Sequence, residues 1–195
     1  MTASGLPVRV ELADADATRD YGRALAAVLR AGDVVLLTGD LGAGKTTLTQ
    51  GIGAGLGVRG QVASPTFIIA RVHPSLTDGP ALVHVDAYRL GSLEEVDGLD
   101  LDASLEESVT VVEWGEGLVE SLARDRLEVS IRRPRGGLDA GALDTGDRDA
   151  GSFDADPFDA DPIDADPIDA AAGTRTVRVR AVGTRWAGVS LPAVG

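Results

Sequence analysis

Eight consecutive residues of the chain have the types and spacing needed to hold a phosphate group: Gly39-Asp40-Leu41-Gly42-Ala43-Gly44-Lys45-Thr46. They match the pattern G-x-x-x-x-G-K-[ST], in which the glycines let backbone N–H groups turn inward around phosphate oxygens. Lys45 would reach the outer phosphates, and the Thr46 hydroxyl would ligate magnesium. Lys45 is the only lysine among 18 Lys and Arg residues. This indicates a position where the bulkier, planar head of arginine cannot serve.

The segments on either side of this loop have the patterns of a strand and a helix. Residues 34–38 form a short, β-branched apolar run that predicts a buried strand. Residues 46–56 carry apolar side chains at helical spacing, and Gly57 is a fitting C-terminal stop. The positive end of such a helix dipole would face the phosphates. An incidental lysine in a glycine-rich turn would not explain this context. We expect contacts to a nucleotide from Asp40, Leu41, Gly42, Ala43, Gly44, Lys45, Thr46 and Thr47.

Further apolar runs predict an α/β fold around this unit. Strands are predicted at residues 8–12, 68–73, 81–86, 109–113, 127–132 and 176–182, and helices at residues 17–30 and 118–123. Asp14 or Asp16 can cap the helix that follows the first strand, and residues 93–107 predict short helices with loops. The last two strands can pair as a hairpin. We therefore expect a three-layer α/β/α arrangement with a central, mostly parallel sheet and a C-terminal β-hairpin.

Two of the predicted strands end in an acidic residue, Asp86 and Glu113. In open α/β sheets, ligands bind beyond the carboxyl ends of the strands, so both acids could point to the nucleotide. In nucleoside triphosphatases with this loop, one such acid is the second magnesium ligand. The sequence leaves open which of the two it is, and each could also be an ordinary solvated acid.

Three neighbouring residues have alternative interpretations. Thr66 lies in an uncharged segment and could sense the terminal phosphate as a switch residue does, or could be a turn threonine. Trp114 could pack on the nucleotide or in the core. By strand alternation His84 shares a face with Asp86, and we expect it to be a packed, hydrogen-bonded histidine.

Length and composition restrict the class of protein. At 195 residues with 44% hydrophobic residues, we expect a single domain, residues 1–195. The absence of cysteine excludes disulfides and thiolate metal sites and agrees with a cytoplasmic protein. No apolar run reaches the roughly 18 residues that a membrane span needs, and the N-terminal residues lack a signal-peptide pattern.

Residues 134–172 concentrate the negative charge of the chain. They hold 11 aspartates and two arginines, so the remaining residues carry only −4 of the net charge of −13. A five-residue repeat from Phe153 onward places a proline at every fifth position, which forbids a regular helix or a central strand. We expect a disordered acidic insertion within the C-terminal hairpin. Calcium binding is an alternative, but the repeat lacks the turn-forming glycines that gather ligands.

Four motifs together carry a resemblance to a known family. They are Gly39-Asp40-Leu41-Gly42-Ala43-Gly44-Lys45-Thr46-Thr47, Ser64-Pro65-Thr66-Phe67, His84-Val85-Asp86-Ala87-Tyr88-Arg89-Leu90 and Val112-Glu113-Trp114. In this order and spacing they resemble the TsaE (YjeE) family, the small bacterial ATPases of tRNA threonylcarbamoyladenosine synthesis. The resemblance covers residues 8–132 and, more loosely, the last strand. Gly115 stands where the family usually has a proline.

The resemblance implies a P-loop fold that hydrolyses ATP with magnesium. It implies that Thr46 and Glu113 hold the ion, that Asp86 acts near the attacking water, that Thr66 lies near the terminal phosphate and that Trp114 lies near the nucleotide. It also implies partnership with TsaD and TsaB, which transfer the threonylcarbamoyl group to the adenosine beside the anticodon. Because the chain is acidic, we expect contact with tRNA only through that complex. Because it has no membrane-span pattern, we expect no contact with a membrane.

Two other classes of protein remain open from the sequence alone. A small-molecule P-loop kinase uses the same loop, although such enzymes usually carry arginines in a lid, and here the long insertion is acidic. A nucleotide-gated binding module would bind ATP without turnover. A GTPase is disfavoured because its guanine-reading segment needs a second lysine. The sequence does not identify an arginine finger, the residue that would stabilise charge on the transferred phosphate. Arg89 is the nearest candidate, and Arg132 and Arg133 are weaker ones. A partner could also supply this group.

Overall fold

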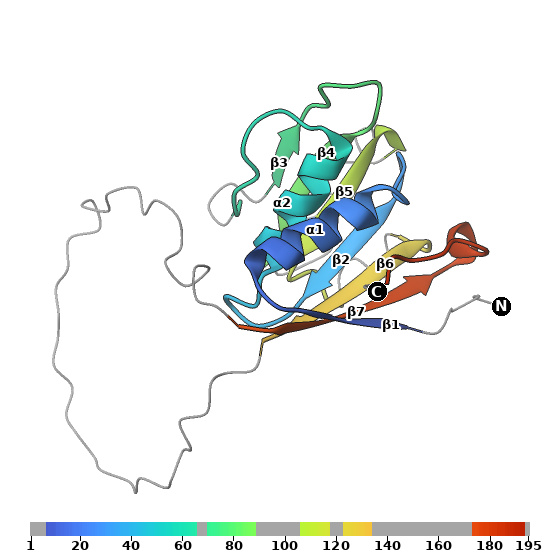
Figure 1. Ribbon diagram of the computed structural model, residues 1–195. Coiled ribbons are helices and arrows are strands. Elements are labelled where there is room, and N and C mark those ends of the chain that lie inside the picture. Colours follow the sequence, from blue (N-terminus) through green and yellow to red (C-terminus); the bar gives the residue numbers. More distant parts are fainter. Residues whose placement is uncertain (1–6, 66–69, 89–105, 118–122, 134–172, 194–195) are drawn as a thin grey trace, which may run out of the picture.

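The computed structural model describes residues 7–65, 70–88, 106–117, 123–133 and 173–193. These residues form one sheet of seven strands in the order β1-β7-β6-β2-β5-β4-β3, with two α-helices and a short 3-10 helix (Figure 1). The elements are β1 (Val8–Leu12), α1 (Ala15–Ala26), β2 (Val34–Thr38), α2 (Lys45–Leu56), β3 (Ala70–His73), β4 (Ala81–Asp86), β5 (Ser108–Glu113), β6 (Arg126–Arg132), β7 (Arg175–Val182) and η1 (Thr184–Trp186).

The four central strands of the sheet are parallel. β2 lies between β6 and β5, β4 extends the parallel set beyond β5, and antiparallel strands flank it on both sides. β6 and β7 pair antiparallel, which confirms the predicted C-terminal hairpin, and β1 adds antiparallel to β7. Parallel strands put their carboxyl ends at one edge, so β2, β4 and β5 deliver the phosphate-binding loop, Asp86 and Glu113 to the same place.

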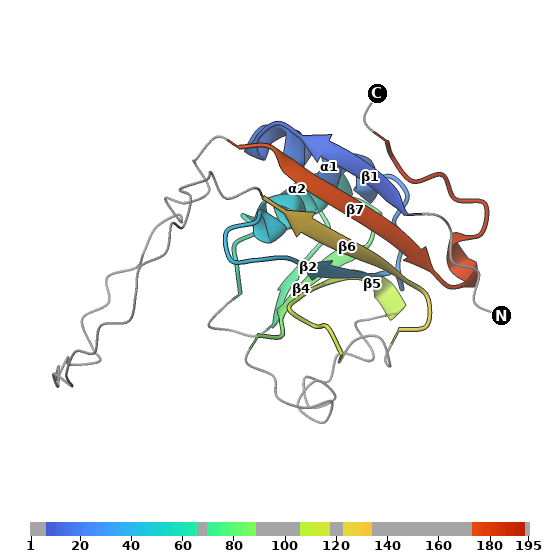
Figure 2. The ribbon, with the colours of Figure 1, turned by 90° about the horizontal axis from the view of Figure 1, so that it is seen from below.

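Both described helices cover one face of the sheet, as Figures 1 and 2 show. Alternation divides β2 between two apolar clusters: Val35 and Leu37 pack beneath the helices, while Val34 and Leu36 pack on the opposite face. The helices predicted in residues 93–107 and 118–123 fall mostly outside the described residues. Neither α1 nor α2 is long and apolar enough to cross a membrane.

α1 begins where the sequence indicates and ends earlier than predicted. Asp14 is the N-cap, and its Oδ1 accepts a hydrogen bond of 2.8 Å from the backbone N–H of Ala17. The prediction that the helix continues to Arg30 is wrong, since α1 ends at Ala26. Beyond it the chain tightens into i→i+3 bonds, and the Asp33 side chain accepts from the N–H of Arg30 at 2.9 Å. These bonds replace the helical ones.

α2 follows the phosphate-binding loop without interruption and packs tightly on α1. It ends at Gly57, which adopts a left-handed conformation (φ +69°) as predicted. A Cβ on Gly51 would lie 2.1 Å from the carbonyl oxygen of Arg19, and one on Gly22 would lie 2.4 Å from that of Leu48. The two backbones therefore approach too closely for any larger residue at these positions.

The ends of β6 and β7 next to the acidic insertion lie side by side, because Arg132 pairs with Thr176. Residues 134–172 themselves lie outside the described residues.

We expect deletion of residues 136–171 to leave folding intact, because the paired strand ends need only a short connection. A shorter loop also costs less closure entropy. Thermal unfolding followed by circular dichroism should show a melting temperature within about 4 °C of the full chain. A larger loss would mean that the insertion stabilises the fold.

Candidate functional site

The loop between β2 and α2 leaves the start of α2 without a side-chain cap. Gly44, the residue before α2, adopts φ +109°, which is strained for any residue with a Cβ. No side chain caps the start of α2, and no acidic residue lies in its first turn. The first N–H groups of a helix have no partner within the helix, so here they are available to an anion, and the helix dipole adds to the attraction.

Lys45 lies at the centre of the site. Its side-chain ammonium donates to the carbonyl oxygens of Gly39 (2.9 Å) and Asp40 (3.1 Å), and it lies 4.0 Å from the centroid of the Trp114 ring. Burial lowers the pKa of Lys45 below its ordinary value, while the charges of Glu113, Asp86 and Asp40 act in the opposite direction. In place of water, the ammonium therefore has loop carbonyls and an aromatic ring as direct neighbours, and the charges of nearby carboxylates act on it.

Glu113 connects the loop to the end of β5. Its Oε1 accepts a hydrogen bond of 3.1 Å from Thr46 Oγ1 and lies 2.8 Å from His84 Nε2. Glu113 is 3% exposed and His84 is fully buried. An ionised carboxylate only accepts hydrogen bonds, so His84 donates through Nε2. The expectation of a packed, hydrogen-bonded histidine holds, and its partner is the acid at the end of the neighbouring strand.

Asp86 lies beside Glu113 but makes a different contact. The two residues are paired in register on the parallel strands β4 and β5. Asp86 is buried, and its Oδ1 accepts a hydrogen bond of 3.0 Å from the backbone N–H of Tyr88. Asp86 thus orders the turn that follows its own strand, whereas Glu113 contacts Thr46 of the loop.

The residues present fit a magnesium ion that is shared with a nucleotide. Mg²⁺ prefers oxygen ligands, and in such sites it takes one or two protein groups together with phosphate oxygens and waters. Thr46 Oγ1 and Glu113 Oε1, 3.1 Å apart, form such a pair. Within the described parts of the chain, no three His, Cys, Asp or Glu residues gather to hold a metal by themselves. A nucleotide would therefore need to supply part of the coordination.

Trp114 follows Glu113 in a strained conformation. Among the described residues it is the one non-glycine residue with a positive φ (+62°), which costs roughly 1–2 kcal/mol. The turn brings its indole over the Lys45 ammonium and into an edge contact with Tyr88, with ring centroids 5.5 Å apart. Backbone strain of this kind persists where the surroundings hold it, commonly at binding sites. Here it builds an aromatic wall beside the loop.

The structure brings together most, but not all, of the residues that the sequence singled out. Those that meet at the carboxyl edge of β2, β4 and β5 are Lys45, Thr46, Asp86, Glu113 and Trp114. Asp40 and Leu41 are exposed in the loop, while Ala43, Gly44 and Thr47 are buried. Thr66 and Arg89 lie outside the described residues. Arg132 is exposed at the end of β6.

Two residues near the site were not predicted from the sequence. Tyr88 forms the outer part of the aromatic pair and is 69% exposed. Arg175, the first residue of β7, is fully buried beside Gly44. A signal for Arg175 does exist, because strand alternation places it on the same face as the core residues Val177 and Val179.

A buried strand, a phosphate-binding loop, the helix after it and two acids at neighbouring strand ends define a P-loop NTPase-like fold. The family model described as "Threonylcarbamoyl adenosine biosynthesis protein TsaE" matches residues 12–137. The chain belongs to the TsaE family, and the resemblance inferred from the four motifs is confirmed.

Related proteins and a solved structure agree with this assignment. The chain is 69% identical over 119 residues to a Streptomyces coelicolor protein named tRNA threonylcarbamoyladenosine biosynthesis protein TsaE, covering 60% of this chain and 80% of that protein. It is 50% identical over 123 residues to the Mycobacterium bovis protein of the same name, covering 60% and 73%. The crystal structure of Bacillus subtilis YdiB superimposes with a TM-score of 0.59 at 28% identity, covering 96% of this chain and 91% of YdiB.

Proposed function

We propose that this protein binds and hydrolyses ATP with Mg²⁺ and thereby supports a TsaB–TsaD complex that forms threonylcarbamoyladenosine on tRNA. One observation carries the catalytic part of the proposal. The Glu113 carboxylate accepts from Thr46 of the phosphate-binding loop at 3.1 Å, so the acid at a strand end and the hydroxyl of the loop meet where P-loop nucleotide hydrolases hold their metal.

Binding of the triphosphate falls to the loop and to Lys45. The N–H groups at the start of α2 donate to phosphate oxygens, and the Lys45 ammonium leaves the carbonyl oxygens of Gly39 and Asp40 to bind the outer phosphates. The exchange favours binding because a phosphate oxygen is a charged acceptor, whereas the carbonyls are neutral. The Trp114 indole, beside Lys45, lies where it can border the nucleotide.

Thr46 and Glu113 would hold the magnesium ion. When bound, the ion neutralises charge on the phosphate oxygens as the bond to the terminal phosphate breaks. His84 acts on this site through Glu113: its Nε2 donates to Oε1 and fixes the orientation of the carboxylate. Partners of this kind, which bind a ligand residue and not the metal, commonly tune metal affinity.

Asp86 is proposed to orient the attacking water. It is paired in register with Glu113, so its carboxylate lies at the same edge of the sheet. Its Oδ1 accepts from the N–H of Tyr88, and the second carboxylate oxygen provides a further acceptor for a water molecule. Thr66 stays the predicted contact to the terminal phosphate. Positioning and charge stabilisation together suffice for phosphoryl transfer, which needs little covalent chemistry from the protein.

The family and the surface near the loop support the proposed partners. The relatives are named for tRNA threonylcarbamoyladenosine biosynthesis, a modification of RNA, and we place the protein in the cytoplasm with its substrate complex. Leu41, in the loop, is 84% exposed and Tyr88 is 69% exposed. Apolar side chains beside a nucleotide site give a partner protein a surface to cover. Contact with tRNA is proposed only through the complex.

ATP hydrolysis by the purified protein, alone and with TsaB and TsaD added, tests the proposal. We expect a slow basal rate that rises at least about tenfold with both partners, because a group supplied in trans can stabilise the charge of the transition state. Bovine serum albumin in place of the partners is the control. A rate that the partners leave unchanged would contradict the supporting role. ATP binding without turnover in the full mixture would favour the binding module instead, and phosphate transfer to a small acceptor would favour the kinase.

A further inference from the structure

Arg175 is a buried cation that none of the roles above uses. It begins β7 and is 0% exposed, and its side chain donates to the carbonyl oxygen of Gly173 at 3.0 Å. Surface arginines are the rule, because burial of a charge in a medium of low dielectric is unfavourable unless opposite charge compensates for it. The position of Arg175 therefore requires an explanation in terms of its neighbours.

The side chain of Arg175 lies against the backbone of the phosphate-binding loop. A Cβ on Gly44 would lie 3.1 Å from Nε and 3.4 Å from Cδ of Arg175, and 3.9 Å from Thr18 Cγ2. Arg175 thus fills the place where the loop, α1 and β7 meet, next to the residue that precedes Lys45. Because glycine has no side chain, Gly44 leaves room for Arg175 to lie against the loop, on the side where α1 and β7 pack.

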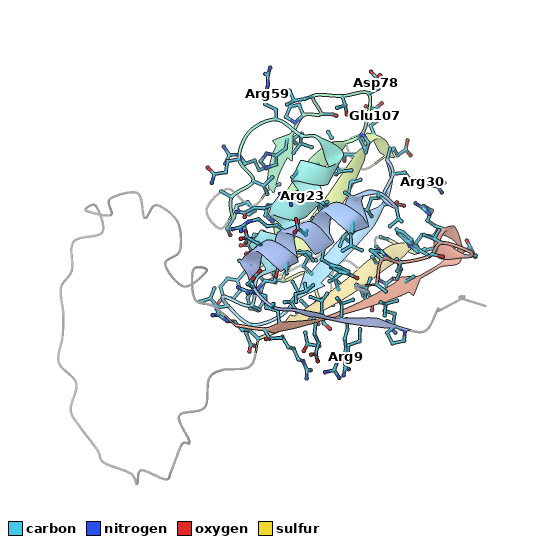
Figure 3. The ribbon with its side chains drawn as sticks, in the orientation of Figure 1. Arg9, Arg23, Arg30, Arg59, Asp78 and Glu107 are labelled. Atoms are coloured by element: carbon cyan, nitrogen blue, oxygen red, sulfur yellow. The ribbon has the colours of Figure 1, made fainter. Side chains whose placement is uncertain are left out.

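Other arginines of β7 have a different environment. Arg178 and Arg180 point to the other face of the strand and are exposed, and Arg180 pairs with Glu128. Arg9 lies on this same outer side of the sheet, away from α1, as Figure 3 shows. Of the β7 arginines described, Arg175 is the one buried on the face that carries the loop and the helices.

We propose that Arg175 is a positioning residue of the nucleotide site, which holds the loop from behind and supplies a permanent positive charge to the phosphates bound in front. A guanidinium cannot lose its proton in a protein, so the charge is present at every working pH. Its field acts through the buried loop backbone at Gly44, and Coulomb attraction is stronger in a protein interior than in solvent. The inference rests on the proposed function, because it requires phosphates in the loop.

Two substitutions test the proposal, with Arg178→Met as a matched control on the exposed face of the same strand. Arg175→Met removes the charge and keeps an apolar chain, and Arg175→Gln removes the charge and keeps a hydrogen-bond donor for Gly173.

The measurements are the Kd for ATP by calorimetry and the melting temperature without ligand. We expect both variants to bind ATP about tenfold more weakly, as the loss of one charge near the phosphates implies. Without ligand, at least one variant should melt no lower than the parent, since apolar replacement of a buried ion is often tolerated. Arg178→Met should change neither quantity.

The outcomes separate this inference from the proposed function. If the melting temperature falls while the Kd for ATP stays normal, Arg175 is a packing residue and the inference is overturned. If Arg175→Met does not fold, the Kd of Arg175→Gln decides in the same way. Lys45→Ala, measured in parallel, reports on the loop itself. Normal binding by that variant would refute the nucleotide site, whereas normal binding by the Arg175 variants alone would refute only the role of Arg175.

Discussion

Replacing Lys45 with alanine should abolish ATP hydrolysis and weaken ATP binding by about 100-fold or more, the loss we expect for a charged group that contacts phosphate in a water-poor site. The structure gives the reason. Lys45 is 5% exposed and reaches the loop carbonyls of Gly39 and Asp40 at 2.9 and 3.1 Å, so its ammonium is held within the loop that we propose to bind the phosphates. Hydrolysis followed by phosphate release, and binding followed by calorimetry, measure the two effects.

Lys45→Arg is the informative companion, because it keeps the charge. The ammonium lies between the loop carbonyls and the Trp114 ring, 4.0 Å from its centroid. The planar guanidinium is wider than the ammonium that occupies this space. It also cannot rotate its donors as an ammonium does. We therefore expect Lys45→Arg to fail in hydrolysis nearly as completely as alanine. Normal turnover in either variant would show that the nucleotide is bound elsewhere.

Replacing Glu113 with glutamine should remove the Mg²⁺ dependence of ATP binding and lower hydrolysis by about 100- to 1,000-fold, the size typical of losing one electrostatic group at a reacting centre. Glu113 accepts from both Thr46 and His84. A glutamine keeps the size of the side chain but loses the charge that would bind the ion. The amide would also present a donor where the structure needs an acceptor.

Asp86→Asn distinguishes the two acids. Because Asp86 contacts the N–H of Tyr88 and not Thr46, we expect this variant to keep the Mg²⁺-dependent increase in ATP affinity and to lose turnover. A titration of Mg²⁺ at fixed ATP, with affinity and rate measured in parallel, separates the roles. Glu128→Gln, in β6 on the outer face of the sheet, is the control and should leave both readouts unchanged. The reverse pattern for Asp86 and Glu113 would exchange their assignments.

Local patterns explain why the centre of the fold could be predicted from the sequence. The run at residues 34–38, the glycines of the loop and the apolar spacing after it each favour the conformation that the chain adopts, and Gly57 ends α2 as expected. The acids that end two buried strands, Asp86 and Glu113, indicated that both could point to one site, because parallel strands end at one edge. No tertiary information was needed for these conclusions.

Other features depend on contacts that no local pattern encodes. The early end of α1 follows from the Asp33 side chain, which binds the N–H of Arg30 and competes with the helix. The positive φ of Trp114 arises where β5 leaves the sheet beside Lys45. The burial of Arg175 requires the loop to pass in front of β7. In each case residues far apart in the sequence decide the local structure.

The close approach of α1 and α2 has a mechanical consequence. The Gly51 and Gly22 contacts leave no side chains between the backbones, so one helix cannot slide along the other without backbone collision. A shift of the loop on nucleotide binding or release must therefore carry α1 with it. α1 is tied through Tyr21 to the carbonyl oxygen of Pro192, 3.0 Å from its hydroxyl. We therefore expect the two helices to move as one body, so that the contact of Tyr21 couples the loop to the C-terminal segment at Pro192.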